Sequence, residues 1–290
     1  SNDVWELDLT TNVWKNISPS TGTKPNRRRA HTSIYYNDKM VIFGGYNSYI
    51  SGYYLNDVWE FVARGGEVSE VTRALGDYNL IVPSVIAMRQ WGDFEGWEHQ
   101  LVLDEAKRRF ALGARLGAPF IVATPPLEKE ETEHLPERYG ELLQIGREEG
   151  ILPTFEYISF FQSVYTLEGA WKIVNESNDP DATLILDAFH NWNSASSPDT
   201  LRNIPASKIS HYHIDDAGLN KEAGSQTDPD RVMPGDGQID FKAEIEILKE
   251  IGYDKTVSLE LFNQEWWEKE PEETLRVGLE RIKSLFENSD

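Results

Sequence analysis

The sequence predicts an α/β protein whose larger part is a (β/α) barrel of about six parallel strands, preceded by an antiparallel β segment. Three observations support this prediction. After about residue 64, short apolar runs alternate with amphipathic stretches, which is typical of a parallel sheet with crossover helices. Several of these runs end in an acidic residue or a histidine. Residues 1–63 instead carry a loose internal repeat and equal numbers of acidic and basic side chains.

The first 63 residues repeat one motif. Residues 2–7 (NDVWEL) return as residues 56–61 (NDVWEF), at a spacing near that of a propeller blade. Between the two copies lie the tripeptide RAH at residues 29–31 and the apolar run KMVIFGG at residues 39–45. These features resemble the kelch repeat, which implies strands of about one blade. A propeller needs roughly four to eight blades, so this segment alone cannot form one, and a kelch-type interaction module is disfavoured.

Six apolar runs after the junction predict the parallel strands. Each run is short, as expected for strands that are buried on both faces. Glycines at 117, 150 and 252 stand just before three of the runs, where the end of a helix favours a left-handed residue. The predicted strands are residues 81–87, 120–123, 152–156, 183–187, 209–214 and 256–261.

The stretches between these runs have apolar residues near helical spacing and predict crossover helices. Such helices turn one apolar face toward the sheet. The two clearest faces are Phe241, Ile245, Leu248 and Ile251, and Leu101, Ala106, Phe110 and Leu112.

Four consecutive predicted strands end with a candidate metal ligand. In a (β/α) barrel the reactive residues lie at the C-terminal ends of the strands, where the loops form one mouth. Three carboxylates and one imidazole suit Mn²⁺, Mg²⁺ or Co²⁺, and Zn²⁺ is also possible. The four candidates are Glu156, Asp187, His213 and Glu260.

Each candidate also has a purely structural interpretation. Either glutamate alone is more often half of an ion pair, and Asp187 with His190 three residues later is compatible with a hydrogen bond in a loop. His211 lies on the same side of its strand as His213 but deeper, which favours a buried core histidine. The metal interpretation rests on the four residues taken together.

Five segments resemble the xylose isomerase-like, sugar phosphate isomerase/epimerase family over roughly residues 64–285. They are residues 155–156 (FE), 186–190 (LDAFH), 211–216 (HYHIDD), 234–241 (PGDGQIDF) and 258–262 (SLELF). The resemblance implies a TIM-type barrel with one divalent metal held by the four candidates. It also implies that His190 contacts a small sugar or polyol substrate, and that Glu156 and Glu260 exchange a proton at one carbon as acid and base.

The family pattern begins with a strand, a helix and a strand that this sequence lacks, so about one quarter of the barrel is replaced by the kelch-like segment. We therefore divide the chain into residues 1–63, a kelch-like segment, and 64–290, a partial barrel. We expect residues 56–62 to fill the second barrel position, parallel to residues 82–87. Residues 40–44 would lie antiparallel beside them, as in a kelch meander. Antiparallel kelch-derived strands would thus close or extend the barrel.

This organisation predicts a chimeric protein, engineered or recombined, whose barrel retains a divalent-metal site as a relic with doubtful activity. The alternative is a functional metal-dependent isomerase or epimerase of sugars or polyols. Endonuclease activity is disfavoured because the sequence lacks further metal-binding histidines and glutamates and is strongly acidic.

The composition limits which binding partners and which cellular compartment we expect for the protein. The net charge of −21 lies entirely after residue 63 and disfavours nucleic acid as a partner. We expect neither a signal peptide nor a membrane span, because the sequence has no basic start followed by an apolar stretch and no run of about 18 apolar residues. With no cysteine, the protein is expected to be soluble and cytoplasmic. Oligomeric state is not readable from these features.

Overall fold

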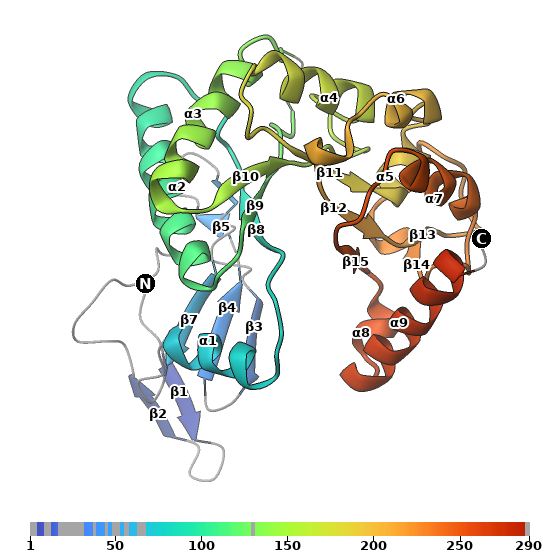
Figure 1. Cartoon of the computed structure of the whole chain (residues 1–290). Coiled ribbons are helices and arrows are strands. Elements are labelled where there is room, and N and C mark those ends of the chain that lie inside the picture. The colour runs from blue at the N-terminus through green and yellow to red at the C-terminus, as the bar shows by residue number, and fades with distance from the viewer. Residues whose placement is uncertain are drawn as a thin grey trace. The chain divides into compact units, whose positions relative to one another are not determined.

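A computed structural model describes residues 68–128 and 131–287 and, before them, seven short strands between Trp5 and Val62. The chain forms two compact units, Ser1–Asn79 and Leu80–Asp290 (Figure 1). Residues 29–31 and the double glycine at 44 and 45, which belong to the kelch-like pattern, lie outside the described residues.

The first unit consists of antiparallel strands followed by one helix. β1 (Trp5–Asp8) pairs with β2 (Val13–Asn16), and β5 (Tyr46–Asn47) pairs with β6 (Tyr53–Tyr54). A three-stranded sheet has the order β3 (Thr32–Tyr36), β4 (Lys39–Phe43) and β7 (Val58–Val62). The predicted antiparallel pairing of the run at 40–44 with the strand at 56–62 is therefore confirmed. Helix α1 (Val68–Asp77) ends the unit.

The second unit is an incomplete TIM-type barrel of six parallel strands. The sheet order is β15-β12-β11-β10-β9-β8, so consecutive strands of the barrel are neighbours and every pair is parallel. This confirms the predicted fold class and all six predicted strands. The pairing of β7 with β8, which would join the two units, stays a prediction. The strands are β8 (Ser84–Met88), β9 (Phe120–Ala123), β10 (Leu152–Phe155), β11 (Leu184–Asp187), β12 (Ile209–Ile214) and β15 (Val257–Leu259).

Helices connect these strands as expected for a parallel sheet (Figure 1). The predicted glycines end three of them with left-handed φ angles of 76°, 81° and 76° at Gly117, Gly150 and Gly252. Among the described residues, no helix is both long and apolar enough to cross a membrane. The helices are α2 (Gly96–Arg115), α3 (Leu135–Glu149), α4 (Leu167–Glu176), α5 (Ala188–Asn193), α6 (Pro198–Arg202), α7 (Phe241–Glu250), α8 (Gln264–Trp267) and α9 (Pro271–Glu287).

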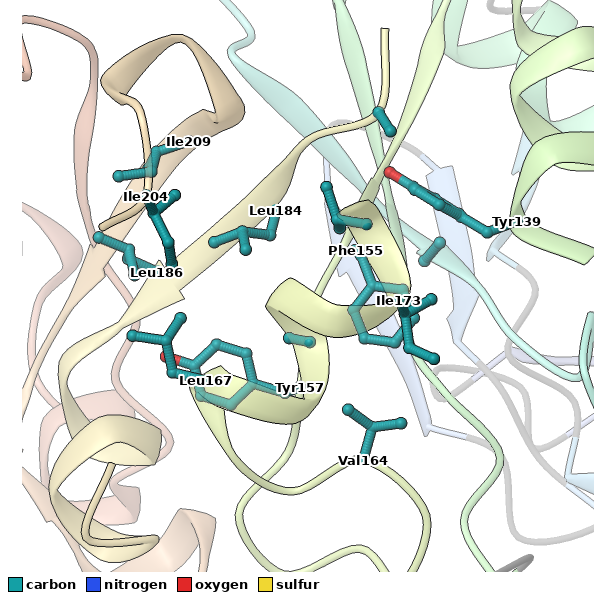
Figure 2. Close-up of a cluster of buried hydrophobic side chains, with 14 of the residues drawn as sticks. Tyr139, Phe155, Tyr157, Val164, Leu167, Ile173, Leu184, Leu186, Ile204 and Ile209 are labelled. Atoms are coloured by element: carbon teal, nitrogen blue, oxygen red, sulfur yellow. The ribbon is translucent and has the colours of Figure 1, made fainter. Parts of the chain in front are cut away.

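The main core lies between the strands and the helices that cover them. Figure 2 shows part of it, where Phe155 of β10 faces Tyr139 of α3 and Ile173 of α4. The Tyr139 hydroxyl lies 3.0 Å from the Pro153 carbonyl oxygen and 2.8 Å from that of Thr183, and it donates its single proton to one or the other. Burying apolar surface on this scale is the dominant favourable term in folding.

Helix α7 buries the predicted face, with Phe241, Ile245 and Leu248 in the core. The predicted face of α2 is wrong in part. Its buried side chains include Ala106 and Phe110, but Leu101 and Leu112 remain 57% and 43% exposed. Leu101 is five residues before Ala106 and Leu112 is two after Phe110, and neither spacing keeps a side chain on one face of a helix.

The inner face of the barrel strands has a different character. Its separate apolar cluster comprises only Ala87, Val122 and Ile185 among the described residues. Polar side chains occupy the neighbouring inner positions, and they are buried: Thr154, Thr183, Ser210 and His211. Buried polar groups are tolerated only when they are hydrogen-bonded, and these side chains hydrogen-bond to one another. They form a polar layer beneath the C-terminal ends of the strands.

Candidate metal centre

The four predicted ligands meet at the C-terminal ends of their strands. Glu156 directly follows β10, Asp187 ends β11, His213 lies near the end of β12 and Glu260 directly follows β15. One ligand atom from each residue lies within 4.8 Å of the other three. Parallel strands bring their carboxyl ends to one edge of a sheet, which is why residues far apart in the chain converge here.

The imidazole of His213 sits among three carboxylates. Its Nδ1 lies 3.1 Å from Glu156 Oε1, 3.2 Å from Glu260 Oε2 and 4.0 Å from Asp187 Oδ2. This nitrogen is buried, yet none of the described side chains is aligned to form a regular hydrogen bond with it. A buried nitrogen aimed at three acids suits a cation between them, so the residues present fit a divalent metal.

Electrostatics reinforce this interpretation. Burial raises the pKa of Glu156, and the nearby Glu260 and Asp187 carboxylates act in the same direction. Burial acts to lower the pKa of His213, but the charges of Glu260 and Glu156 outweigh it and raise that pKa well above its ordinary value. The His213 shift reflects the negative charge gathered around its buried ring, which a bound cation would offset.

Arg231 is the residue of this site that the sequence reasoning missed. It belongs to β14 (Arg231–Val232), which pairs with β13 (Asp216–Ala217), and it is only 1% exposed. Its Nη1 donates to Asp187 Oδ2 at 3.0 Å and contacts the Asp215 carboxylate. Its Nη2 donates to Asp228 Oδ1 at 3.1 Å.

The Arg231 charge has a direct electrostatic consequence. Burial acts to raise the pKa of Asp187, but the charge of Arg231 together with the two neighbouring histidines outweighs it and holds that pKa well below its usual range. Asp187 therefore stays ionised, as a metal ligand must. The sequence signal for Arg231 was weak, because its partners come from separate elements; its position shortly before the glycine loop at residues 234–237 was the only hint.

His190 lies beside this centre. Its backbone N–H donates to Asp187 Oδ1 at 2.7 Å, which caps helix α5. Its Nε2 accepts from Arg231 Nη2 at 3.1 Å, and its Nδ1 lies 3.0 Å from Ser159 Oγ. Burial lowers the pKa of His190 to about 4, and Arg231 adds to this effect, so the ring is neutral at neutral pH. Its predicted contact with substrate stays a prediction.

A hydrogen-bonded loop supports the mouth of the site. The Asp216 carboxylate accepts from the backbone N–H groups of Gly235 and Gly237, each at 2.9 Å, and of Ile239 at 3.0 Å. A Cβ atom added at Gly237 would lie 2.2 Å from the Ala217 carbonyl oxygen. The glycine is therefore required for the close approach of two backbone segments.

His211 is buried and hydrogen-bonded, as predicted. Its Nε2 lies 3.2 Å from Ser84 Oγ and 3.2 Å from His213 Nε2, and its Nδ1 lies 3.1 Å from Ser210 Oγ. It is outside the group of candidate ligands.

Comparison with known proteins places this geometry in context. A family model described as a xylose isomerase-like TIM barrel matches residues 55–285. Inosose isomerase of Bacillus subtilis is 35% identical over 187 residues, which are 62% of this chain and 67% of that protein. A 3-dehydroshikimate dehydratase of Pseudomonas putida is 25% identical over 215 residues, covering 72% of this chain but 33% of that protein.

The solved structures agree on the fold. The crystal structure of the IOLI protein with a bound zinc atom aligns with a TM-score of 0.73 and 26% identity, covering 78% of this chain and 84% of that one. A structure of L-ribulose 3-epimerase aligns with a TM-score of 0.62 and 18% identity over 78% of this chain and 82% of that one. The second similarity supports the fold alone.

The N-terminal segment matches a different family. A Kelch-repeats domain model matches residues 1–75. Kelch domain-containing protein 3 of Bos taurus is 35% identical over 60 residues, which are 21% of this chain and 15% of that protein. The two family matches overlap at residues 55–75, so β7 and most of α1 fit both patterns.

Proposed function

Because this chain belongs to the xylose isomerase-like TIM barrel family, we propose that it is a metal-dependent isomerase or epimerase of a small polyhydroxylated ketone. The observation that carries the proposal is the convergence of Glu156, Asp187, His213 and Glu260 within 4.8 Å. The 35% identity to an inosose isomerase supports a cyclic polyol ketone as the substrate class.

The four residues would hold a divalent ion, Mn²⁺, Mg²⁺, Co²⁺ or Zn²⁺, which when bound polarises a substrate oxygen next to the reacting carbon. Zinc gains support from the related structure with a bound zinc atom. Glu156 and Glu260 then act as base and acid, exchanging a proton at the carbon beside the carbonyl.

The other residues of the site would bind the substrate and orient the metal ligands. His190 is neutral, and its ring would bind a substrate hydroxyl by giving up its hydrogen bond to Arg231 or to Ser159. Arg231 offsets the charge of the buried carboxylates and fixes Asp187. The buried ring of Phe189 lies 4.6 Å from the Arg231 guanidinium and packs against it.

The relic interpretation, in which the metal site survives without turnover, is less well supported than the functional alternative. All four candidate ligands and the groups that orient them are present and mutually arranged. The adjoining family matches support a recombined origin of the chain, and an engineered origin stays a prediction. Sugar or polyol binding, cytoplasmic location and the absence of nucleic acid partners likewise stay predictions.

A metal titration tests the proposal. We expect the wild type to bind Co²⁺ or Mn²⁺, and Glu156→Gln/Glu260→Gln to lose most of this affinity because two charged ligands become neutral amides. Glu176→Gln/Glu246→Gln is the matched control, since both side chains are exposed on helices. Equal metal affinity in the wild type and the first double variant would refute the metal site.

Turnover is tested separately on the metal-loaded protein. Incubation with inososes and ketohexoses in D₂O should give isomerised product that carries deuterium at the reacting carbon. Metal binding without deuterium incorporation into any substrate would support the relic interpretation instead.

A further inference from the structure

We propose that His211 is a positioning residue that orients the candidate ligand His213 by accepting a hydrogen bond from its Nε2–H. This inference rests on the proposed metal site. It concerns the polar layer beneath that site, where His211 is 1% exposed and His213 is 4% exposed.

The geometry of His213 fixes which nitrogen can bind the metal. Nδ1 is the atom that faces Glu156 and Glu260, at 3.1 and 3.2 Å. Nε2 faces the opposite way, 3.2 Å from His211 Nε2. A neutral imidazole carries a single N–H, so a ring that binds a cation through Nδ1 must be protonated on Nε2.

A buried Nε2–H needs an acceptor, because an unpaired buried donor is costly. For that bond, His211 must present its Nε2 lone pair and carry its own proton on Nδ1. Its Nδ1 lies 3.1 Å from Ser210 Oγ, which can accept this proton. Ser210 Oγ in turn donates to the Leu184 carbonyl at 3.2 Å or to Thr154 Oγ1 at 2.7 Å.

The opposite arrangement is incompatible with metal binding. If His211 carried its proton on Nε2, it would donate to Ser84 Oγ, which lies 3.2 Å away. His213 Nε2 would then lack an acceptor for a proton and would hold its own proton on Nδ1, facing the carboxylates. That proton would occupy the position of the cation.

The same bond serves the protein with and without metal. When His213 is fully protonated among the carboxylates, its Nε2–H still points to His211. Binding a cation then displaces only the Nδ1 proton and leaves the ring in place. Such outer hydrogen bonds orient metal-binding histidines in general, and their loss typically costs about 10- to 100-fold in metal affinity.

The first test needs no variant. Long-range ¹H–¹⁵N spectra of the full chain, metal-free and Zn²⁺-loaded, report which ring nitrogens carry protons. We expect an unprotonated Nε2 on His211 in both states, and a protonated Nε2 with a metal-bound Nδ1 on His213. A proton on His211 Nε2, or Zn²⁺ bound through His213 Nε2, would overturn the inference.

Variants give the second test, read out as Zn²⁺ affinity by chelator competition. His211→Phe keeps a planar ring but removes the acceptor, and should lose about 10- to 100-fold in affinity. His211→Gln supplies a carbonyl oxygen as acceptor and should regain most of the loss. Ser84→Ala is the control: it should bind Zn²⁺ as the wild type does, because the serine hydroxyl is not needed in the proposed arrangement.

The outcomes separate the two proposals. A wild type that binds none of Zn²⁺, Co²⁺ and Mn²⁺ refutes the metal site, and the proton on His211 in the metal-free spectrum still decides the present inference. A wild type that binds Zn²⁺ together with equally tight binding by His211→Phe refutes the positioning role alone. A loss of affinity in Ser84→Ala that matches His211→Phe would also overturn it.

Discussion

At the scale of single residues, Arg231 supplies the positive charge that pairs with the buried carboxylates of the site. Its guanidinium pairs with Asp187, Asp215 and Glu260, which are separated from it by 44, 16 and 29 positions along the chain. These separations explain why sequence reasoning found Asp187 and Glu260 but missed Asp215 and the counter-charge. The acids follow recognisable strands, whereas the burial of an arginine depends on contacts between distant segments.

Replacing Arg231 tests this balance. In the metal-free protein, Arg231→Met leaves Asp187 and Asp215 buried without their partner, so the free energy of unfolding should fall by about 3–5 kcal/mol. Urea denaturation with a chelator present measures the change. Arg281→Met removes the exposed pair with Asp236, at 2.8 Å, and should cost under about 1 kcal/mol. Equal losses in the two variants would contradict the central role of Arg231.

At the scale of elements, the sequence predicted the barrel strands correctly, but it did not predict the buried face of helix α2. All six barrel strands were predictable because each is a short apolar run beside amphipathic stretches, and glycines precede three of them. Helix α2 buries His99 together with Ala106 and Phe110, so its inner face includes a polar residue that an apolar pattern cannot reveal. His99 is accommodated by its contact with Glu141 at 2.7 Å, which belongs to α3.

The glycine loop after β14 gives a prediction at this scale. A methyl group at Gly237 would meet the Ala217 carbonyl oxygen at 2.2 Å and Asp216 Oδ1 at 2.4 Å. Because the first contact is with backbone, Gly237→Ala must displace the loop and weaken its hydrogen bonds to Asp216. We expect a loss of about 1–3 kcal/mol in the free energy of unfolding.

The matched control for that loop is Gly140→Ala. Gly140 lies within helix α3, and a Cβ atom there would have no neighbour within 4 Å. Alanine is the better helix former, so this variant should gain about 0.5–1 kcal/mol. Thermal denaturation of both variants would show melting temperatures that move in opposite directions. A shift of both in the same direction would mean that the contact at Gly237 is not decisive.

At the scale of the whole molecule, the open question is how an incomplete barrel is stabilised. The six-stranded sheet ends at β8 and β15, and among the described strands each has a partner on one side only. On β8, Ile86 is 55% exposed, and Ile81 just before the strand is 80% exposed. Exposed apolar edges of this kind promote association between chains. The two family matches overlap at residues 55–75, which include β7, the strand that we predict to fill a missing barrel position.

A fragment comprising residues 80–290 tests this prediction against the full chain. If residues 56–62 lie beside β8, removing residues 1–79 uncovers that edge, so the fragment should self-associate at concentrations where the full chain does not, as measured by sedimentation and light scattering. Ile86→Lys in the fragment should reduce the association, because a lysine on an edge strand opposes pairing with another strand. The same substitution in the full chain should destabilise it if residues 56–62 lie beside β8. A monomeric fragment with the stability of the full chain would show that the six strands need no completion, and that the kelch-like segment contributes nothing to the barrel.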